Sequence, residues 1–404
     1  MALQSSLSDQ LLSPEIRMVF RALGENHVRF VGGCVRNALL GEPIRDIDLA
    51  TTLFPQNVTD RLSKNGIKSI PTGIDHGTVS AIINGKSFEI TTLRIDKKTD
   101  GRRAKVEFSD DWEGDARRRD FTMNALYADL DGHVYDPLGV GLADLEKRKV
   151  RFVGDPDLRI REDFLRFLRF FRFSLFYGKG KFDRQGYDAC GRHAAGLKKL
   201  SRERITQELT KIILHPDCPK ALDKMRQAKG LASLFGRNFD VVALKRLVDC
   251  QAGQAYGEDH LFVTRLLVVS GFGSQVEERI GKWLVLKKKQ RALVGVLGSF
   301  RINTIRIDTG RVTRWMVEDG RDLALMRLDL CYALGHLSRA LHHKFSVQIS
   351  QDSIPVFPVG AADLMSLGYR GGALGECLRE LHRVWTRSGF KGDRQALLGK
   401  VIPK

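Results

Sequence analysis

The spacing of hydrophobic residues changes near residue 150. Before that point, short apolar runs typical of β-strands alternate with turn residues, at 28–31, 77–83, 87–93 and 125–128. Asn84-Gly85 separates two of these runs and predicts a hairpin, because a type I′ turn needs positive φ at both central residues. From Leu158 onward, apolar residues recur every three or four positions, as they do along the buried face of a helix. The pattern therefore predicts an α+β protein, with a mixed α/β part followed by an all-helical remainder.

The segment from Asp96 to Ala116 breaks this pattern. It is dense in Lys, Arg, Asp and Gly. Polar stretches of this kind between periodic segments are typical of loops. We therefore predict a mobile loop in this segment.

The chain carries a strong positive charge. Among its 404 residues, 66 Lys+Arg exceed 48 Asp+Glu by 18, and hydrophobic residues make up 43%. This balance is typical of a globular protein, and the surplus charge favours a polyanionic partner, of which nucleic acid is the commonest. No apolar run approaches the ~20 residues that a membrane-spanning helix needs, so we expect no membrane segment.

The start of the chain and the cysteines bear on the cellular compartment. The chain does not start with the basic segment and apolar core of a secretory signal. A mitochondrial transit peptide would carry early arginines, whereas the first arginine here is Arg17, so we expect a cytoplasmic protein. The six cysteines lie far apart and form no Cys-x-x-Cys pair. We therefore expect reduced thiols rather than disulfides or a zinc site.

A glycine pair follows the first predicted strand. Gly32-Gly33 joins the run 28–31 to a helix-like segment, which leaves backbone N–H groups free at the helix N-terminus. Such groups bind phosphate, and Arg36 on the first turn adds a positive charge. If the glycine pair is considered alone, an ordinary strand–helix turn explains it better than a phosphate-binding turn does.

Two aspartates change that balance. Asp46-Ile47-Asp48 begins ten residues after Arg36, and residues i and i+2 of a strand project from the same face. Adjacent carboxylates repel each other unless a cation lies between them, and their oxygens suit Mg²⁺. A phosphate cradle followed by Asp-x-Asp indicates an attack on a phosphorus atom assisted by metal ions. Glu89 is a further candidate carboxylate, although an exposed strand glutamate explains it equally well.

With these motifs, the sequence resembles the class II CCA-adding tRNA nucleotidyltransferases, a family of the DNA polymerase β-like superfamily. The blocks that resemble the family's motifs A to E stand in order at Gly32–Arg36 with Asp46–Thr51, Arg118–Ala125, Asp136–Leu145, Glu162–Phe173 and Arg202–Leu209. The third block has one extra residue. The segment 357–398 resembles the family's tail more loosely, and 220–350 resembles it only in being helical.

The resemblance implies four segments. They are a nucleotidyltransferase head at 1–150, a helical neck with base recognition at 151–215, a helical body at 216–345 and a helical tail that binds tRNA at 346–404.

The fourth block suggests how a base is selected. Asp163 and Arg166 are three residues apart on a predicted helix, and so are Arg169 and Arg172, so we expect the members of each pair to face the same way. A carboxylate beside a guanidinium complements the amine and adjacent ring nitrogen of cytosine or adenine, but not the carbonyl and ring N–H of uracil or guanine. A surface ion pair is the simpler alternative for Asp163 and Arg166.

The resemblance also assigns roles to other residues. In the second block, it implies that Arg119 contacts a phosphate and that Asp120 and Asn124 bind the ribose; a plain basic loop is the alternative. Asp46 and Asp48 would bind Mg²⁺ as the catalytic pair. The residues that would hold the nucleotide's triphosphate, base and remaining phosphates are Gly33, Arg36, Asp163, Arg166, Arg169 and Arg172.

The function implied is addition of C, C and A to the 3′ end of immature or damaged tRNA, from CTP and ATP. A bacterial-type poly(A) polymerase is the nearer alternative, although the block 75–94 resembles CCA-adding enzymes instead. An enzyme that adds only CC or only A, and a catalytically idle RNA-binding paralogue, are further alternatives. The two aspartates argue against the idle paralogue. The chain is a monomer or a homodimer, and its protein partners are left open.

Overall fold

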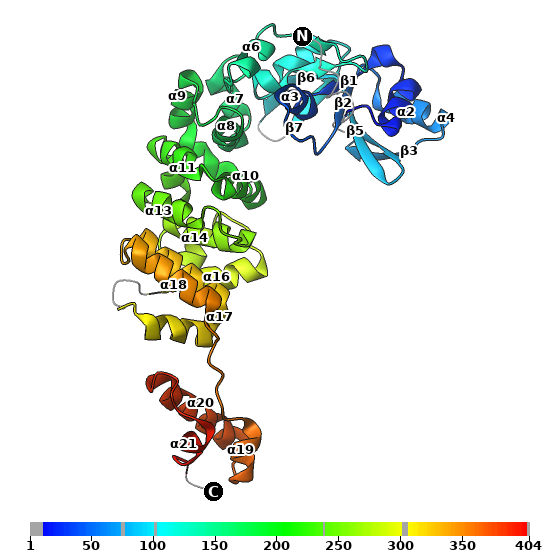
Figure 1. The fold of residues 1–404 in the computed structure, drawn as a ribbon. Coiled ribbons are helices and arrows are strands. Elements are labelled where there is room, and N and C mark those ends of the chain that lie inside the picture. The colour runs from blue at the N-terminus through cyan, green and yellow to red at the C-terminus, as the bar shows by residue number, and fades with distance from the viewer. Residues whose placement is uncertain (1–10, 74–76, 101–102, 237–238, 301–305, 402–404) are drawn as a thin grey trace. The chain divides into compact units, whose positions relative to one another are not determined.

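The computed structural model describes residues 11–73, 77–100, 103–236, 239–300 and 306–401, so residues 75 and 76 of the block 75–94 lie outside it. The chain divides into two units, Met1–Arg237 and Asn238–Lys404 (Figure 1). The first contains the sheet and the second is helical, which confirms the predicted α+β class. The segment boundaries predicted at 150, 215 and 345 stay predictions.

A mixed sheet occupies the amino-terminal part of the first unit. Its strands lie in the order β3-β4-β5-β2-β1-β8-β9, and only β2 and β5 pair in parallel. The strands are β1 (Val28–Val31), β2 (Asp48–Thr51), β3 (Lys68–Gly73), β4 (Thr78–Ile83), β5 (Lys86–Thr92), β8 (Tyr127–Ala128) and β9 (Val134–Tyr135). Helix α2 (Pro14–Leu23) packs on α4 (Pro55–Lys64), and α3 (Gly33–Leu40) packs on β1.

The hairpin predicted at Asn84-Gly85 is confirmed. It joins β4 to β5, with Ile83 paired to Lys86 across the turn. Both central residues have positive φ, 51° for Asn84 and 76° for Gly85, as a type I′ turn requires.

The loop predicted at 96–116 is wrong as a description of secondary structure. The chain there forms a second hairpin, β6 (Arg94–Asp100) and β7 (Arg103–Phe108), followed by helix α5 (Trp112–Arg117). Five of the seven residues of β6 and three of the six residues of β7 are charged, and this high charge is typical of a loop, although polar and apolar residues alternate along β7. The Asp111 side chain caps α5 by accepting a hydrogen bond from the Glu113 amide at 2.9 Å.

Seven helices complete the first unit: α6 (Gly141–Glu146), α7 (Pro156–Glu162), α8 (Leu165–Phe176), α9 (Arg184–His193), α10 (Arg202–Leu214), α11 (Cys218–Gln227) and α12 (Gly230–Phe235). Helix α8 packs on α10 and α11 and buries a row of phenylalanines. Phe170 stacks on Phe152, with 5.4 Å between ring centroids, and Phe173 contacts Phe121 at 5.0 Å. These aromatic contacts fix α8 against the segment that follows the sheet.

The second unit consists of α13 (Val241–Gln251), α14 (Glu258–Ser270), α15 (Val276–Gly281), α16 (Lys288–Gly298), α17 (Thr309–Ala333), α18 (Arg339–Gln351), α19 (Ala361–Ser366), α20 (Gly371–Arg387) and α21 (Arg394–Leu398). A kink at Gly320, where φ is 81°, interrupts α17. A separate small core around Trp385 holds α19, α20 and α21 together.

A buried polar cluster ties four of these helices together. The carboxylate of Asp329, which is fully buried, is hydrogen-bonded to the Nε2 atoms of His260 at 2.9 Å and His342 at 2.8 Å. Cys250 lies close enough to Asp329 and His342 for all three to share a metal ion. Because hydrogen bonds already pair both carboxylate oxygens, the cluster is explained as a structural network.

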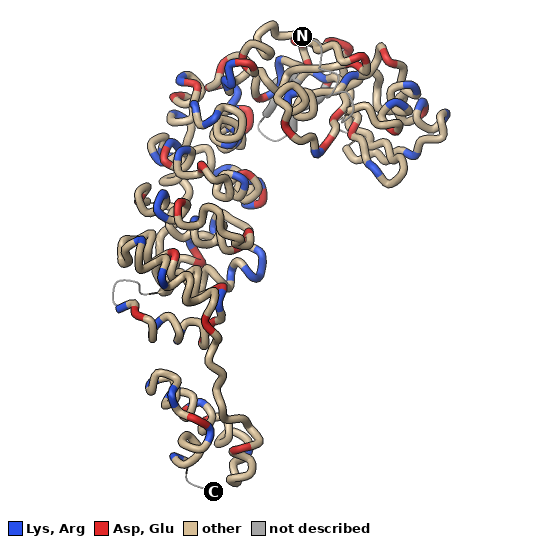
Figure 2. The backbone as a smooth tube through the Cα atoms, viewed as in Figure 1, with Lys and Arg blue, Asp and Glu red and all other residues tan. Residues whose placement is uncertain are grey.

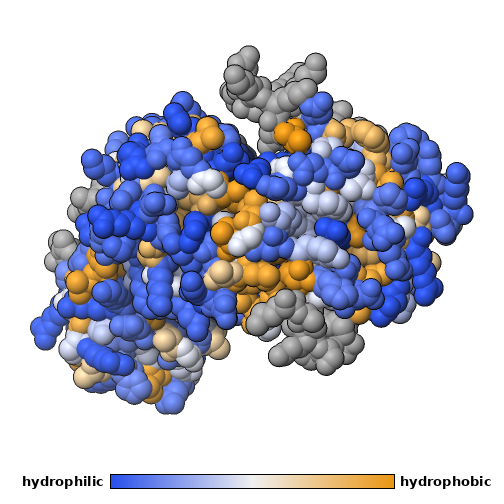
Figure 3. All heavy atoms as spheres, turned by 90° about the horizontal axis from the view of Figure 1, so that it is seen from above, coloured by the Kyte–Doolittle hydropathy of each residue, from blue (hydrophilic) through white to orange (hydrophobic). Residues whose placement is uncertain are grey.

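The many charged residues of the sequence are spread widely over the structure (Figure 2). Figure 2 shows Lys and Arg distributed over both units rather than gathered in one segment. The face seen in Figure 3 is covered mostly by hydrophilic residues, with hydrophobic ones in smaller areas between them. Across the described residues, no helix is both long and apolar enough to cross a membrane.

Candidate active site

The parallel pairing of β2 with β5 places two acidic residues side by side. Asp48 is the register partner of Glu89, so their side chains lie on the same face of the sheet. The strand begins at Asp48, so the predicted placement of Asp46 on the same strand is wrong, and Asp46 lies in the segment without regular structure before β2. All three carboxylates nevertheless border one pocket of about 520 Å³.

This acidic group has the properties of a cation site. Partial burial, together with the neighbouring carboxylates of Glu89 and Asp46, raises the pKa of Asp48 above its usual value, although its side chain reaches solvent. Mutual repulsion of this kind is relieved when a cation binds, and carboxylate oxygens are the ligands that Mg²⁺ prefers. The residues present therefore fit a divalent metal ion.

The glycine pair forms the predicted turn from β1 into α3. Gly32 has φ of 71°, a conformation that residues with a side chain rarely adopt. A Cβ atom on Gly32 would lie 3.4 Å from Arg119 Nη1, so the turn is also closely packed. Cys34 in the first turn of α3 donates a hydrogen bond to the Asp48 carbonyl at 3.6 Å. The helix N-terminus and the acidic group are thus held next to each other.

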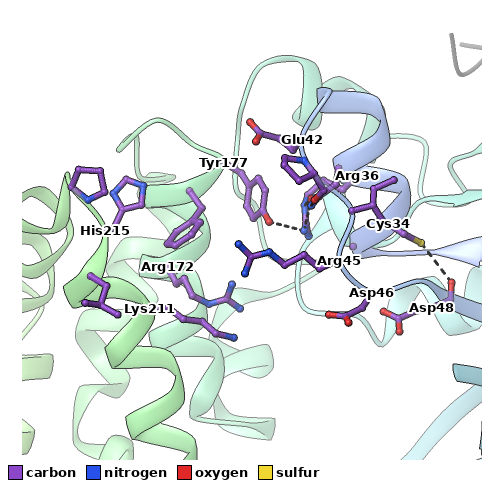
Figure 4. Close-up of a pocket in the computed structure, with 17 residues that line it drawn as sticks. Cys34, Arg36, Glu42, Arg45, Asp46, Asp48, Arg172, Tyr177, Lys211 and His215 are labelled. Atoms are coloured by element: carbon purple, nitrogen blue, oxygen red, sulfur yellow. Dashed lines mark hydrogen bonds between the residues drawn. The ribbon is translucent and has the colours of Figure 1, made fainter. Parts of the chain in front are cut away.

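Arg36 extends from α3 into a second pocket of about 830 Å³, which Gly33, Asp46 and Asp48 also border (Figure 4). Its guanidinium donates hydrogen bonds to Asn124 Oδ1 and, at 2.8 Å, to the Tyr177 hydroxyl. Burial lowers the pKa of Arg36 from its ordinary value. The side chain is therefore fixed in place before any ligand binds.

The predicted ribose-binding residues form one network with two arginines. Asp120 accepts hydrogen bonds from Asn124 Nδ2 at 2.9 Å and from Arg169 Nε at 2.7 Å. Burial alone would raise the pKa of Asp120, but the Arg169 guanidinium and the Asn124 amide outweigh it and lower that pKa. Since Asn124 also accepts from Arg36, a continuous chain of polar contacts runs from Arg36 to Arg169.

Arg119 is oriented by a buried acidic partner. It forms an ion pair with Asp115 at 2.8 Å, and its Nε donates to the Tyr127 hydroxyl at 3.2 Å. Its side chain retains 19% exposure. The guanidinium lies beside Gly32, at the start of the predicted phosphate cradle.

The prediction that Asp163 and Arg166 lie on one helix is wrong. Asp163 follows the last residue of α7 and has an extended backbone, whereas Arg166 belongs to the first turn of α8. Asp163 accepts a hydrogen bond from Arg204 at 2.7 Å, and Arg166 is paired with Glu162 at 2.6 Å. In the described part of the chain, Asp163 and Arg166 form ion pairs with these other residues and not with each other. The simpler alternative, a surface ion pair between the two, is therefore not observed.

The two remaining predicted arginines share a glutamate from α10. Arg172 Nε lies 2.5 Å from Glu208 Oε2, and Arg169 Nη1 lies 3.9 Å from Glu208 Oε1. Glu208 is only 6% exposed. Sequence reasoning gave this residue no role, because one glutamate in an amphipathic helix carries no signal of its partner.

Sequence reasoning also missed residues on the wall of the larger pocket. Arg45, Lys211 and Tyr177 border it together with Arg172. The position of Arg45 directly before Asp46 indicates that it lies near the acidic group. Lys211 on α10 and Tyr177 at the end of α8 lie far along the chain, and nothing in the sequence near them indicates that they border the pocket. Figure 4 shows the side chains of Arg45, Arg172 and Lys211 extending toward a common space across from Asp46 and Asp48.

Two family models match the first unit. Residues 28–151 match the model described as "Poly A polymerase head domain", and residues 181–237 match "Probable RNA and SrmB- binding site of polymerase A". These matches cover the sheet, the acidic group and part of the helices behind it.

Relatives of known name extend over nearly the whole chain. The chain is 34% identical to "CCA tRNA nucleotidyltransferase 1, mitochondrial" of Danio rerio, over 93% of this chain and 86% of that protein. It is 33% identical to the protein of the same name from Homo sapiens, over 97% and 92%. The "CCA-adding enzyme" of a Streptococcus pyogenes strain is 31% identical over 80% and 81%.

Solved structures show the same fold. The Bacillus stearothermophilus CCA-adding enzyme, determined in complex with CTP, aligns with a TM-score of 0.68 and 26% identity, over 93% of this chain and 94% of that one. The Thermotoga maritima CCA-adding enzyme, complexed with tRNA, aligns with a TM-score of 0.69 and 20% identity, over 99% and 98%. From its sequence and its fold, the chain belongs to the CCA-adding enzymes, the tRNA nucleotidyltransferases of the DNA polymerase β-like superfamily.

Proposed function

We propose that this protein adds C, C and A to the 3′ end of tRNA, using CTP and ATP and releasing pyrophosphate. The observation that carries the proposal is the acidic group Asp46, Asp48 and Glu89 beside the glycine turn and Arg36. Relatives that share most of the chain are named for CCA addition. The RNA substrate is tRNA that is immature or has lost its 3′ end.

The acidic group supports a phosphoryl-transfer mechanism. The ribose 3′-hydroxyl of the tRNA attacks the α-phosphorus of the nucleotide, and pyrophosphate leaves. Asp46, Asp48 and Glu89 would hold Mg²⁺, which supplies charge neutralisation and activation of the attacking hydroxyl. The protein's own contribution is to fix these carboxylates on and just before the neighbouring strands β5 and β2 and to hold both substrates in line.

The glycine turn and Arg36 support binding of the triphosphate. The amides of the α3 N-terminus, beginning at Gly33, favour negative charge. Arg36 is held by Asn124 and Tyr177, so little side-chain entropy is lost when it contacts phosphate. Arg119, beside Gly32, would add a second guanidinium.

The network around Asp120 supports selection of ribonucleotides. Asp120 and Asn124 keep fixed orientations through Arg36 and Arg169. A carboxylate has about four acceptor positions, and those of Asp120 are filled by the Phe121 amide, the Asn124 side chain and two nitrogens of Arg169, so a ribose hydroxyl would bind Asp120 by displacing one of these donors. Arg169 and Arg172 would supply positive charge next to the bound nucleotide.

Base selection would come from Asp163 and Arg166. Asp163 is held by its ion pair with Arg204, and Arg166 by its ion pair with Glu162. Offered together to a base, they present an acceptor beside a donor, the complement of cytosine and adenine. A site that hydrogen-bonds its substrate can reject analogues strongly, because a mismatch leaves buried polar groups unpaired.

The proposal is tested with purified protein, Mg²⁺ and tRNA that ends at the discriminator base. Extension by three nucleotides in the presence of CTP and ATP is expected, whereas a long A-tail would identify a poly(A) polymerase. A product that stops after two added C residues, or extension only of tRNA already ending in CC, would identify a partial enzyme.

The compartment is a separate question. Relatives from zebrafish, mouse and human are named as mitochondrial. We propose the cytoplasm, as expected from the sequence, and fractionation of cells followed by immunoblotting tests it.

A further inference from the structure

Two pockets share part of the acidic group and differ in their other lining residues. Arg45, Asp46 and Asp48 border both of them. The smaller pocket adds Glu89 and Lys86, which is paired with Glu15, and the larger one adds the helix N-terminus at Gly33 and the guanidinium of Arg36. The reacting phosphorus lies at the shared aspartates if the proposed function holds, so the two pockets receive different parts of the reactants.

In-line attack decides which part lies where. The attacking and leaving oxygens stand on opposite sides of the phosphorus atom in phosphoryl transfer. Phosphate groups belong in the larger pocket, because its helix N-terminus and Arg36 both attract negative charge. The attacking hydroxyl then approaches from the side of Glu89, and the departing pyrophosphate lies in the larger pocket.

That larger pocket holds more positive charge than the predicted residues supply. The side chains of Arg45, Arg172 and Lys211 all extend into the same part of this pocket (Figure 4). Arg172 has a carboxylate partner in Glu208, whereas within the described part of the chain Arg45 and Lys211 form no ion pair. Like charges that converge without a carboxylate partner repel one another, and a bound polyanion relieves that repulsion.

We propose that Lys211 and Arg45 bind the pyrophosphate half of the nucleotide, a role that rests on the proposed function. As the 3′-oxygen bonds to the α-phosphorus, the bond from that phosphorus to the bridging oxygen breaks. The electron pair remains on the bridging oxygen, and the proton of the 3′-hydroxyl is lost to solvent. Negative charge therefore grows on the leaving group, where Lys211 and Arg45 stabilise it.

Lys211 lies in the last turn of α10 and is exposed, so its substitution leaves the core intact. The test compares Lys211→Ala with Lys211→Arg and with a control, Lys220→Ala. Lys220 is also an exposed lysine, on α11, and it is paired with Asp217 at 2.8 Å. Arg45→Ala is a second, independent variant of the proposed subsite.

Lys211→Ala is expected to lower kcat/KM for CTP about tenfold and to raise the inhibition constant of pyrophosphate by a similar factor, as loss of one charged hydrogen bond implies. The KM for tRNA stays unchanged. Lys211→Arg restores most of the pyrophosphate inhibition, Arg45→Ala repeats the loss, and Lys220→Ala behaves as wild type. A merely structural role for Lys211 would not change pyrophosphate inhibition selectively.

Two results would overturn the inference. One is a raised KM for tRNA with unchanged pyrophosphate inhibition, which would make Lys211 a contact for the RNA backbone. The other is wild-type kinetics in both Lys211→Ala and Arg45→Ala. If the wild-type protein incorporated no nucleotide, the proposed function would fail, and calorimetric titration of wild type and Lys211→Ala with pyrophosphate and Mg²⁺ would still decide the binding role.

Discussion

The ion pair between Glu208 and Arg172 makes a quantitative prediction. Removing the charge with Glu208→Gln leaves the Arg172 guanidinium without its anionic partner, at a place where the two side chains are only 7% and 12% exposed. Breaking a buried ion pair by removing one partner costs about 3–5 kcal/mol. Residual exposure and the ring of Phe173, 4.5 Å from the guanidinium, reduce the loss, so we expect about 2–3 kcal/mol.

The assay is hydrogen-exchange mass spectrometry of peptides that cover α8 and α10. Exchange rates report the free energy of opening in this part of the chain, and they avoid the assumption that both units unfold together. A double-mutant cycle with Arg172→Gln isolates the pair, with an expected coupling energy of about 2 kcal/mol. Glu203→Gln, on the exposed first turn of α10, is the matched control and should change the opening free energy by about 0.5 kcal/mol or less.

A coupling energy below about 1 kcal/mol would refute this reasoning, because pairs exposed to solvent contribute about 0.2–1 kcal/mol. Such a result would mean that water screens the two charges in solution. The alignment of Arg172 toward the larger pocket would then need another cause.

Three further predictions concern the site and the stability of the first unit. Asp46→Ala should reduce nucleotide incorporation by at least a hundredfold while tRNA affinity in a filter-binding assay stays within twofold, because metal-assisted transfer needs this carboxylate; retained turnover contradicts the metal-ligand role. Asp163→Ala should raise incorporation of UTP and GTP relative to CTP and ATP at least tenfold in single-turnover competition, and an unchanged preference contradicts base selection by this residue. Burial alone would raise the pKa of Asp115, but Arg119 and Arg118 outweigh it and hold that pKa at about 2. Because the folded-state pKa lies below the ordinary 3.8, the ionised Asp115 stabilises the fold by about 2 kcal/mol above pH ~4, and this is lost as the pH falls toward 2; urea unfolding of Asp115→Asn should show a matching loss of stability at pH 6 that vanishes at pH 2.

Local signals in the sequence predicted the elements that local physics determines. The Asn84-Gly85 turn needs only its own backbone conformation, and the turn at Gly32-Gly33 needs only the strand before it and the helix after it. The hairpin at 94–108 was missed because the high charge of its strands is typical of a loop, although polar and apolar residues alternate along β7.

Residues brought together by topology were harder to predict. Glu89 joins the aspartates because β2 and β5 pair in parallel, which the spacing along the chain does not reveal. Asp163 and Arg166 were placed on one helix, but the chain ends α7 before it begins α8. Lys211 lies at the site because α10 packs on α8, and no motif near residue 211 predicts that contact.

The most direct test of the whole account is the sequence of the RNA product. The purified protein is incubated with tRNA lacking its 3′ end, Mg²⁺ and equal concentrations of all four ribonucleoside triphosphates, and the new 3′ termini are sequenced. The account predicts C-C-A on nearly every extended molecule and no extension by a variant carrying both Asp46→Ala and Asp48→Ala. Tails of mixed sequence, tails of A alone, or equal extension by that variant would contradict it.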